Sequence, residues 1–127
     1  MEFNQPKGIY LQIADQVCDR ILQGEWSGGD RIPSIRELAV NLGVNPNTVT
    51  RSYQSLLDRQ IIENRRGIGY FVTTNARNNI LKERREEFIR DDLPGMFRTM
   101  RLLDVSIDEI SEYFANYAKE DNTDEST

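Results

Sequence analysis

Apolar side chains recur every three or four positions over the first part of the chain, which is the spacing of one face of an α-helix. The first stripe predicts a helix over 9–22. A second stripe predicts a short helix over 35–42, because the run SIRE from Ser34 to Glu37 forms the capping-box pattern and Gly43 is placed to stop the helix. The turn-rich stretch GEWSGGDRIP separates the two helices.

A third helix is expected to begin at Asn45, a good N-cap, with Pro46 as its first residue. When Val49 marks the direction of the core, Tyr53 and Leu56 lie within about 40° of it at 100° per residue. Polar side chains occupy the flanks and the opposite face. They are Asn47, Thr48, Thr50, Arg51 and Gln54. Two helices packed across a short turn, the second with an exposed polar face, have the geometry of a helix-turn-helix.

The run IIENRRGIGYFV predicts a β-hairpin. Residues 61–62 enter it, 70–72 return, and 65–69 form the turn, so Arg65 and Arg66 lie at the tip. A basic-tipped hairpin directly after a helix-turn-helix is a wing, which can lie along one DNA groove while the third helix occupies the neighbouring major groove. Small polar residues at the start of that helix would let its backbone approach DNA closely.

Helical spacing returns after the hairpin. Apolar residues there alternate steps of four and three, the spacing of a helix-packing seam. Pro94 either kinks this helix or marks a restart after Asp92, and the pattern leaves both open. A second capping box, SIDE from Ser106 to Glu109, opens a last amphipathic helix. The acidic end KEDNTDEST has nothing to bury and is expected to be disordered.

Two helices cannot easily close over an apolar stripe by themselves, so the C-terminal pair is expected to pack against its copy in a symmetric homodimer. The residues expected at that interface are Ile89, Leu93, Met96, Phe97, Met100, Leu103, Ile110 and Phe114. A ligand pocket lined by the same methionines is the less favoured alternative. A dimer would present two recognition helices to a palindromic operator.

The expected fold is mainly α with a small β-wing. The chain divides into a winged helix-turn-helix DNA-binding domain over 1–74, a helical dimerisation extension over 75–118 and a disordered acidic tail over 119–127. With 127 residues, 38% of them hydrophobic, it can bury one modest core plus an appendage. No apolar run approaches the roughly 20 residues that span a bilayer, and the N-terminus lacks a signal-peptide core, which indicates a cytoplasmic protein without a membrane partner.

The net charge of −5 taken alone argues against binding a polyanion, but the charge is not evenly distributed along the chain. The charges cancel over 1–76, so all the net acidity lies beyond Ala76. The stretch 31–74 carries six arginines against three acidic residues. That middle stretch is where double-stranded DNA could dock.

Few catalytic chemistries remain available to this sequence. It contains no histidine, which excludes a histidine general base and the usual zinc sites, and its single cysteine cannot form an internal disulfide. Cys18 lies on the apolar stripe of the first helix, where a buried structural thiol is favoured over a redox sensor. No nucleophile–base pair or phosphate loop is present, so an enzyme, a metal and a cofactor are not expected.

The stretch RIPSIRELAVNLGVNPNTVTRSYQSLLDRQIIENRRGIGYFV resembles the GntR family of bacterial transcription regulators, whose pattern is a winged helix-turn-helix near the N-terminus. The form NPNTVTRSYQSL is similar to the YtrA-type and MocR-type branches. The MocR type carries a large aminotransferase-like domain, which the residues after the wing cannot hold. The length therefore fits the YtrA type, with its short two-helix dimerisation extension.

The resemblance implies roles for individual residues. Arg36 matches a family arginine that contacts DNA, Thr48 a polar position at the start of the recognition helix, and Gly67 a minor-groove glycine of the wing. Pro46 and Thr50 stand where many members have base-reading arginines. From the helical-face argument, the candidate base readers are Asn47 and Arg51. The full set expected to contact DNA is Ser34, Arg36, Asn45, Asn47, Thr48, Thr50, Arg51, Gln54, Arg65, Arg66 and Gly67.

The expected function is that of a sequence-specific DNA-binding transcription regulator, more often a repressor than an activator. The resemblance to YtrA-type regulators implies a link to transport operons. A small-molecule effector is not expected, because so short an extension leaves little room for a pocket outside a dimer interface. The alternative is a winged helix used for protein contact, in which the wing arginines and Asn47 would be dispensable.

Overall fold

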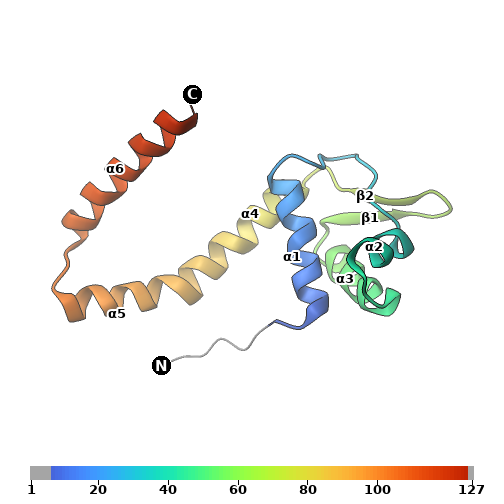
Figure 1. Cartoon of the computed structure of the whole chain (residues 1–127), viewed down its shortest axis with the longest axis horizontal. Coiled ribbons are helices and arrows are strands. Elements are labelled where there is room, and N and C mark those ends of the chain that lie inside the picture. The colour runs from blue at the N-terminus through green and yellow to red at the C-terminus, as the bar shows by residue number, and fades with distance from the viewer. Residues whose placement is uncertain (1–6, 126–127) are drawn as a thin grey trace. The chain divides into compact units, whose positions relative to one another are not determined.

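The computed structural model describes residues 7–125, which belong to two compact units, Met1–Arg84 and Arg85–Thr127. The boundary falls inside helix α4 (Ala76–Glu87; Figure 1). The first unit therefore extends beyond residue 74, where the DNA-binding domain was expected to end. Each unit has its own architecture.

The first unit opens with the three helices expected from the sequence, α1 (Ile9–Leu22), α2 (Ile35–Leu42) and α3 (Pro46–Asp58). The capping box of α2 is present, since the Ser34 Oγ accepts from the Glu37 amide at 3.1 Å and the Glu37 carboxylate accepts from the Ser34 amide at 3.3 Å. The helix ends at Gly43, whose backbone is in the left-handed conformation with a φ of 66°. Glycine adopts this conformation easily because it has no Cβ.

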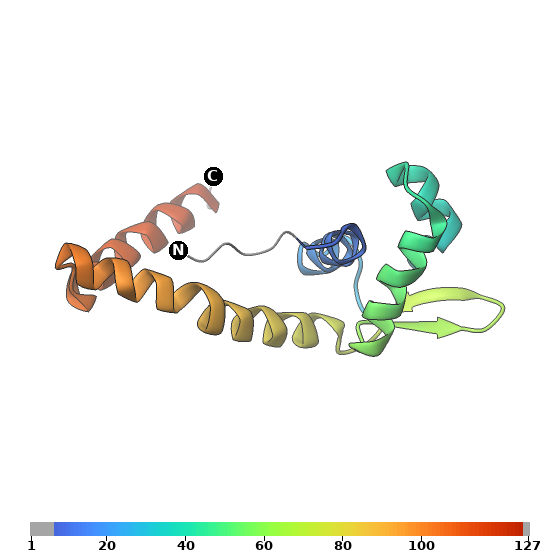
Figure 2. The same ribbon diagram turned by 90° about the horizontal axis from the view of Figure 1, so that it is seen from below.

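A hairpin follows the helices, as the sequence predicts. Strands β1 (Ile62–Arg65) and β2 (Gly69–Val72) pair antiparallel, and Ile62 faces Val72 across the ladder. Arg31 forms an isolated bridge to Phe71, so the loop before α2 touches the hairpin. Figures 1 and 2 both show the hairpin projecting from the helices as a two-stranded ribbon.

The core of the first unit lies between α1, α2, α3 and the base of the hairpin. Val49, Tyr53 and Leu56 of α3 are fully buried, which confirms the direction chosen for its apolar face. Two buried hydroxyls are satisfied: Tyr53 Oη donates to the Pro33 carbonyl at 2.6 Å and Ser52 Oγ donates to the Tyr10 carbonyl at 2.6 Å. Both bonds tie α3 to segments far away in the sequence.

The first part of α4 belongs to this core. Ala76 and Ile80 are buried in it. Farther along, Glu83 pairs with Arg59 at the end of α3, at 2.6 Å from Nη2, and Arg84 pairs with Asp19 of α1 at 2.7 Å. These contacts explain why the compact unit continues to Arg84.

The second unit contains a π-helical turn (Phe88–Asp92), α5 (Leu93–Leu103) and α6 (Ile107–Glu125). The turn leads directly into α5, so Pro94 does not separate two helices by a loop. The Leu93 amide donates to the carbonyl of Phe88, five residues back. This π-type hydrogen bonding lets the helix accommodate Pro94, which has no backbone N–H to donate. The sequence had left this point open.

The last helix begins where the second capping box predicts, and its Ser106 Oγ accepts from the Glu109 amide at 3.2 Å. It continues to Glu125, into the segment 119–127 that was expected to be disordered. A polar sequence can continue a helix that has already begun, because adding a turn costs much less free energy than starting a helix. Residues 126–127 of that prediction lie outside the described part of the chain.

Within residues 7–125, no helix is both long enough and apolar enough to cross a bilayer.

Candidate nucleic-acid interface

The start of α3 presents a row of short polar side chains. The Asn45 Oδ1 caps the helix by accepting from the Asn47 amide at 2.8 Å, so this asparagine is confirmed as a cap. Asn47 and Thr50 are exposed, and Thr48 is half-buried. The Thr50 hydroxyl donates to the Pro46 carbonyl at 3.0 Å, which leaves the Asn47 amide group as the polar side chain directed outward at this end.

The middle of α3 carries two longer polar side chains, both exposed. The Arg51 guanidinium lies over the ring of Tyr10, its Cζ 4.0 Å from the ring centroid. Gln54 donates to the Asp58 carboxylate at 2.8 Å, one turn on. The exposed face of α3 therefore has the composition expected from the sequence, and its Arg51 is stacked on α1.

The beginning of α2 supplies a second polar group. Ser34 is half-buried and its hydroxyl is used in the capping box, while Arg36 is exposed one residue into the helix. A helix N-terminus with an adjacent guanidinium favours an anion such as a phosphate. Ser34 is therefore used as the N-cap of α2, whereas the exposed Arg36 side chain can extend towards a phosphate.

The tip of the wing is basic and tightly turned. Arg65 lies over the Phe71 ring at 4.0 Å and pairs with Glu63 at 3.0 Å, a contact between exposed side chains that is worth little in water. Arg66 is exposed beside Gly67, whose φ of 79° suits glycine. The apolar Ile68 follows and is also exposed.

Arg31 joins the wing although the sequence did not single it out. Its guanidinium lies against Gly69, where an added Cβ would come within 3.0 Å of the Arg31 Nε. Together with Arg65 and Arg66 it places three arginines on or beside one hairpin. The available signal was its position at the start of the net-basic stretch; its contact with a strand almost forty residues away was not visible in the sequence.

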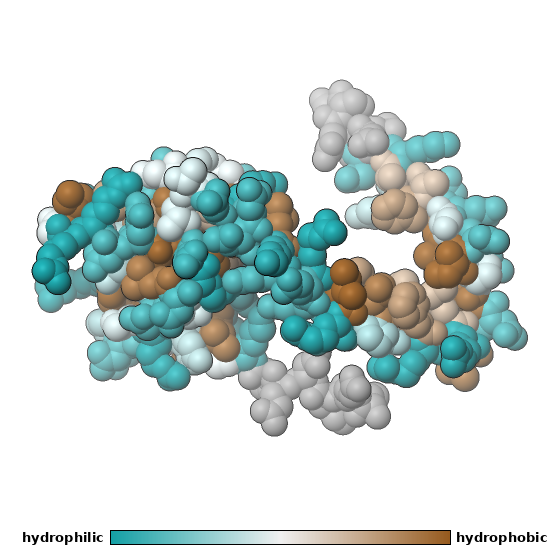
Figure 3. Space-filling view, turned by 180° about the vertical axis from the view of Figure 1, so that it is seen from behind, coloured by the Kyte–Doolittle hydropathy of each residue, from teal (hydrophilic) through white to brown (hydrophobic). Residues whose placement is uncertain are grey.

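The structure brings the residues expected to contact DNA onto one compact unit, whereas the residues expected at a dimer interface all belong to the other. In that second unit the set is largely exposed, with Phe97, Leu103 and Phe114 among its open side chains and Met100 buried. Tyr113 and Tyr117 add to this apolar surface and were not in the expected set. Figure 3 shows brown, hydrophobic residues along the C-terminal helices.

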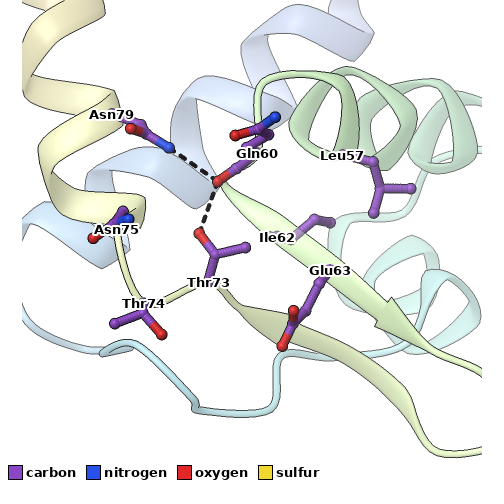
Figure 4. Close-up of a pocket in the computed structure, with 8 residues that line it drawn as sticks. All are labelled: Leu57, Gln60, Ile62, Glu63, Thr73, Thr74, Asn75 and Asn79. Atoms are coloured by element: carbon purple, nitrogen blue, oxygen red, sulfur yellow. Dashed lines mark hydrogen bonds between the residues drawn. The ribbon is translucent and has the colours of Figure 1, made fainter.

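A polar hollow lies where α3, the hairpin and α4 meet (Figure 4). The Gln60 carbonyl at its edge accepts from the Thr73 hydroxyl at 2.7 Å and from the Asn79 amide at 3.1 Å. Gln60 has a φ of 59°, uncommon for a residue with a side chain. The polar groups of this hollow join three elements to one another, which gives it a structural role.

Cys18 is buried, as expected for a structural thiol. Burial raises the pKa of this thiol to about 11, which the nearby Arg59 only partly offsets, so the group is neutral and unreactive at physiological pH. Among the described residues, no group of cysteine and acidic side chains could hold a metal ion.

Known proteins share both the sequence and the fold. Residues 9–72 match the signature described as bacterial regulatory proteins, gntR family. Over 111 residues the chain is 39% identical to the uncharacterised HTH-type transcriptional regulator YhcF of Bacillus subtilis, covering 87% of this chain and 90% of the relative. Over 105 residues it is 33% identical to the HTH-type transcriptional repressor YtrA of the same organism, covering 83% and 80%.

Solved structures give the same result. A crystal structure of a transcriptional regulator of the GntR family from Bacteroides thetaiotaomicron superposes with a TM-score of 0.79 at 42% identity. The match covers 90% of this chain and 99% of that one. The likeness therefore includes the C-terminal helices as well as the winged helix-turn-helix.

Proposed function

Because the chain belongs to the GntR family of bacterial regulatory proteins, and is thus a transcription regulator with a DNA-binding helix-turn-helix, we propose that it acts as a sequence-specific repressor. In this proposal a homodimer occupies a palindromic operator. Its relatives are transcription regulators and not enzymes. The place of action is the compartment that holds the DNA, which in bacteria is the cytoplasm.

The observation that carries sequence-specific binding is the exposed polar face of α3. Asn47 and Arg51 carry paired donors or acceptors that can match base edges, asparagine to adenine and arginine to guanine, whereas the Gln54 amide on the same face already donates to Asp58. Arg36 and the wing arginines, Arg65 and Arg66, supply the positive charge that positions a protein on phosphates. Arg31 adds to this charge.

The exposed apolar surface of α5 and α6 supports the homodimer. Large apolar groups that a single chain leaves in water favour association with a second copy, because burying them removes apolar area from water. A two-fold symmetric dimer matches an operator with two half-sites. The dimer contacts in this proposal are the expected set, joined by Tyr113 and Tyr117.

Repression is favoured by one relative, YtrA of Bacillus subtilis, which is described as a transcriptional repressor. A protein that covers a promoter blocks access of the transcription machinery, so occlusion is the simplest way in which DNA binding alone would repress. We propose a transport operon as the class of target, on the resemblance to YtrA-type regulators.

The salt dependence of DNA binding separates this proposal from a winged helix used for protein contact. Affinity for a mixed-sequence duplex, followed by fluorescence anisotropy, should fall steeply with added salt. For Arg66→Ala the slope should be shallower by about one for each lost phosphate contact. Arg90→Ala removes an exposed charge from the second unit and should leave the slope unchanged.

Two results would favour the protein-contact alternative. One is DNA affinity that does not respond to salt. The other is an unchanged salt slope for Arg66→Ala when circular dichroism shows that this variant is folded.

A further inference from the structure

Tyr10 is the one aromatic side chain in contact with the guanidinium of a candidate base reader among the described residues. It stands near the start of α1, forty-one positions before Arg51, and is half-buried. The core does not require its ring, because the buried stripe of α1 begins at Ile13. A partly exposed tyrosine beside the recognition helix therefore calls for another role.

Tyr10 is held by a contact to its backbone and by a neighbour beside its ring. Its backbone carbonyl accepts from the buried Ser52 hydroxyl of α3 at 2.6 Å, so α1 is tied to the recognition helix at this point. Gly8, whose carbonyl accepts from the Leu11 amide at 3.0 Å, lies beside the ring, since a Cβ added there would come within 3.6 Å of two ring atoms. Arg51, the residue directly before Ser52 in α3, extends over the ring.

Stacking on the ring has two physical consequences for Arg51. A free arginine side chain samples many rotamers and loses entropy when it is fixed, so a side chain that is ordered beforehand loses less on binding. A guanidinium that lies flat on an aromatic face also keeps the N–H groups along its edge available. Those are the groups that would form a bidentate pair with guanine.

We propose that Tyr10 is a positioning residue for base reading, whose ring holds the Arg51 guanidinium ready for the edge of a base in the major groove. The inference rests on the proposed function, in particular on Arg51 as a base reader. It adds a residue of α1, outside the helix-turn-helix, to the determinants of sequence specificity.

The test compares affinities for two duplexes, one enriched from a random library by the wild-type protein and one with the same bases shuffled. Tyr10→Leu keeps apolar volume and removes the aromatic face, and it should lower the ratio of the two affinities roughly two- to fivefold. Affinity for the shuffled duplex should not change. Tyr10→Phe keeps the ring and should preserve the ratio.

A matched control comes from a second stacked pair in the same unit. Arg20 lies over Trp26 at 5.1 Å, and neither residue is a candidate DNA contact. Trp26→Leu removes that ring and should leave the affinity ratio as in the wild type. Circular dichroism and thermal unfolding would confirm that each variant is folded.

A readout independent of DNA comes from proton NMR of the free protein. The ring current of Tyr10 should shift the Arg51 side-chain protons upfield, and Tyr10→Leu should abolish that shift. If the shift is absent in the wild type, the ring does not hold the arginine in solution and the proposal fails.

Combining the two substitutions distinguishes failure of this inference from failure of the proposed function. If Arg51→Ala lowers the affinity ratio and Tyr10→Leu does not, only the positioning role is wrong. If Arg51→Ala itself leaves the ratio unchanged, Arg51 is not a base reader. If both lower it, Tyr10→Leu should have no further effect in the Arg51→Ala background, and an additive loss would overturn the proposal.

Discussion

Single side chains in this molecule are arranged before any partner arrives. Two arginines proposed to reach DNA lie over aromatic rings, Arg51 over Tyr10 and Arg65 over Phe71, each with its Cζ 4.0 Å from the ring centroid. The stacking limits their motion without neutralising their charge. At the scale of residues, the interface is therefore partly ordered in the free protein, which lowers the entropy lost on binding.

The buried thiol of Cys18 gives a prediction about pH. Its pKa is raised by burial from a usual value near 9 to about 11, so the folded chain binds this proton more tightly than the unfolded chain. The resulting stability is fully present below pH 9 and is lost as pH rises towards 11. By pH 10 the free energy of unfolding should have fallen by roughly 1 kcal/mol from this group.

Urea unfolding of the wild type and of Cys18→Ala between pH 7 and pH 10 measures that contribution. The variant should be less stable at neutral pH because of the lost packing, but its stability should decline less towards high pH. Burial also raises the pKa of Tyr53, which affects both proteins equally. Parallel declines would show that Cys18 does not titrate as expected.

At the scale of elements, α4 is joined to the DNA-binding helices by the buried Ala76 and Ile80 and, farther along, by ion pairs. The Arg59 guanidinium donates to both oxygens of Glu83 from Nε and to one of them from Nη2, and both side chains are less than one third exposed. Partly buried, bidentate pairs of this kind contribute more than exposed ones.

We expect Glu83→Gln to lower the free energy of unfolding by about 1–2 kcal/mol, because the Arg59 charge would remain half-buried without its partner. Urea unfolding measures the change. Glu86→Gln makes the same change of charge at an exposed position of the same helix. It is the matched control and should change stability by less than about 0.5 kcal/mol. Equal effects of the two substitutions would mean that the Arg59 pair does not stabilise the junction.

Local signals explain why so much of the first unit was predictable. The caps at Ser34 and Asn45 and the stop at Gly43 each act within a few residues, so α2 begins and ends, and α3 begins, where the sequence indicates. The contact of Arg31 with the wing depends on chain folding over a long separation. The local pattern around Pro94 was compatible with either a kink or a restart, and the π-turn hydrogen bond decided it.

The candidate site divides in the same way. The polar face of α3 followed from helical periodicity, since Val49 and Tyr53 fixed the buried direction. The stacking of Arg51 on Tyr10 could not be predicted, because it depends on how α1 crosses α3. The polar composition of 119–127 predicts disorder, whereas α6 continues to Glu125, because a helix that has begun is extended at little cost.

At the scale of the whole molecule, the exposed apolar surface of α5 and α6 is proposed to be covered by a second copy. Phe114→Glu places a charge in that surface and should shift a dimer towards monomers. Sedimentation velocity at micromolar concentration measures the change. Asn116→Glu adds the same charge to an exposed polar position of α6 and should leave the dimer intact. A wild-type protein that sediments as a monomer would contradict the dimer.

The central claim is that a dimer of this protein reads a specific DNA sequence. The most direct test is selection of bound duplexes from a random library by the purified full chain, at near-physiological salt. We expect enrichment of an inverted repeat, with the two half-sites separated by about one helical turn of DNA or a multiple of it. Absence of any enriched sequence, with a folded and dimeric protein, would contradict sequence-specific regulation.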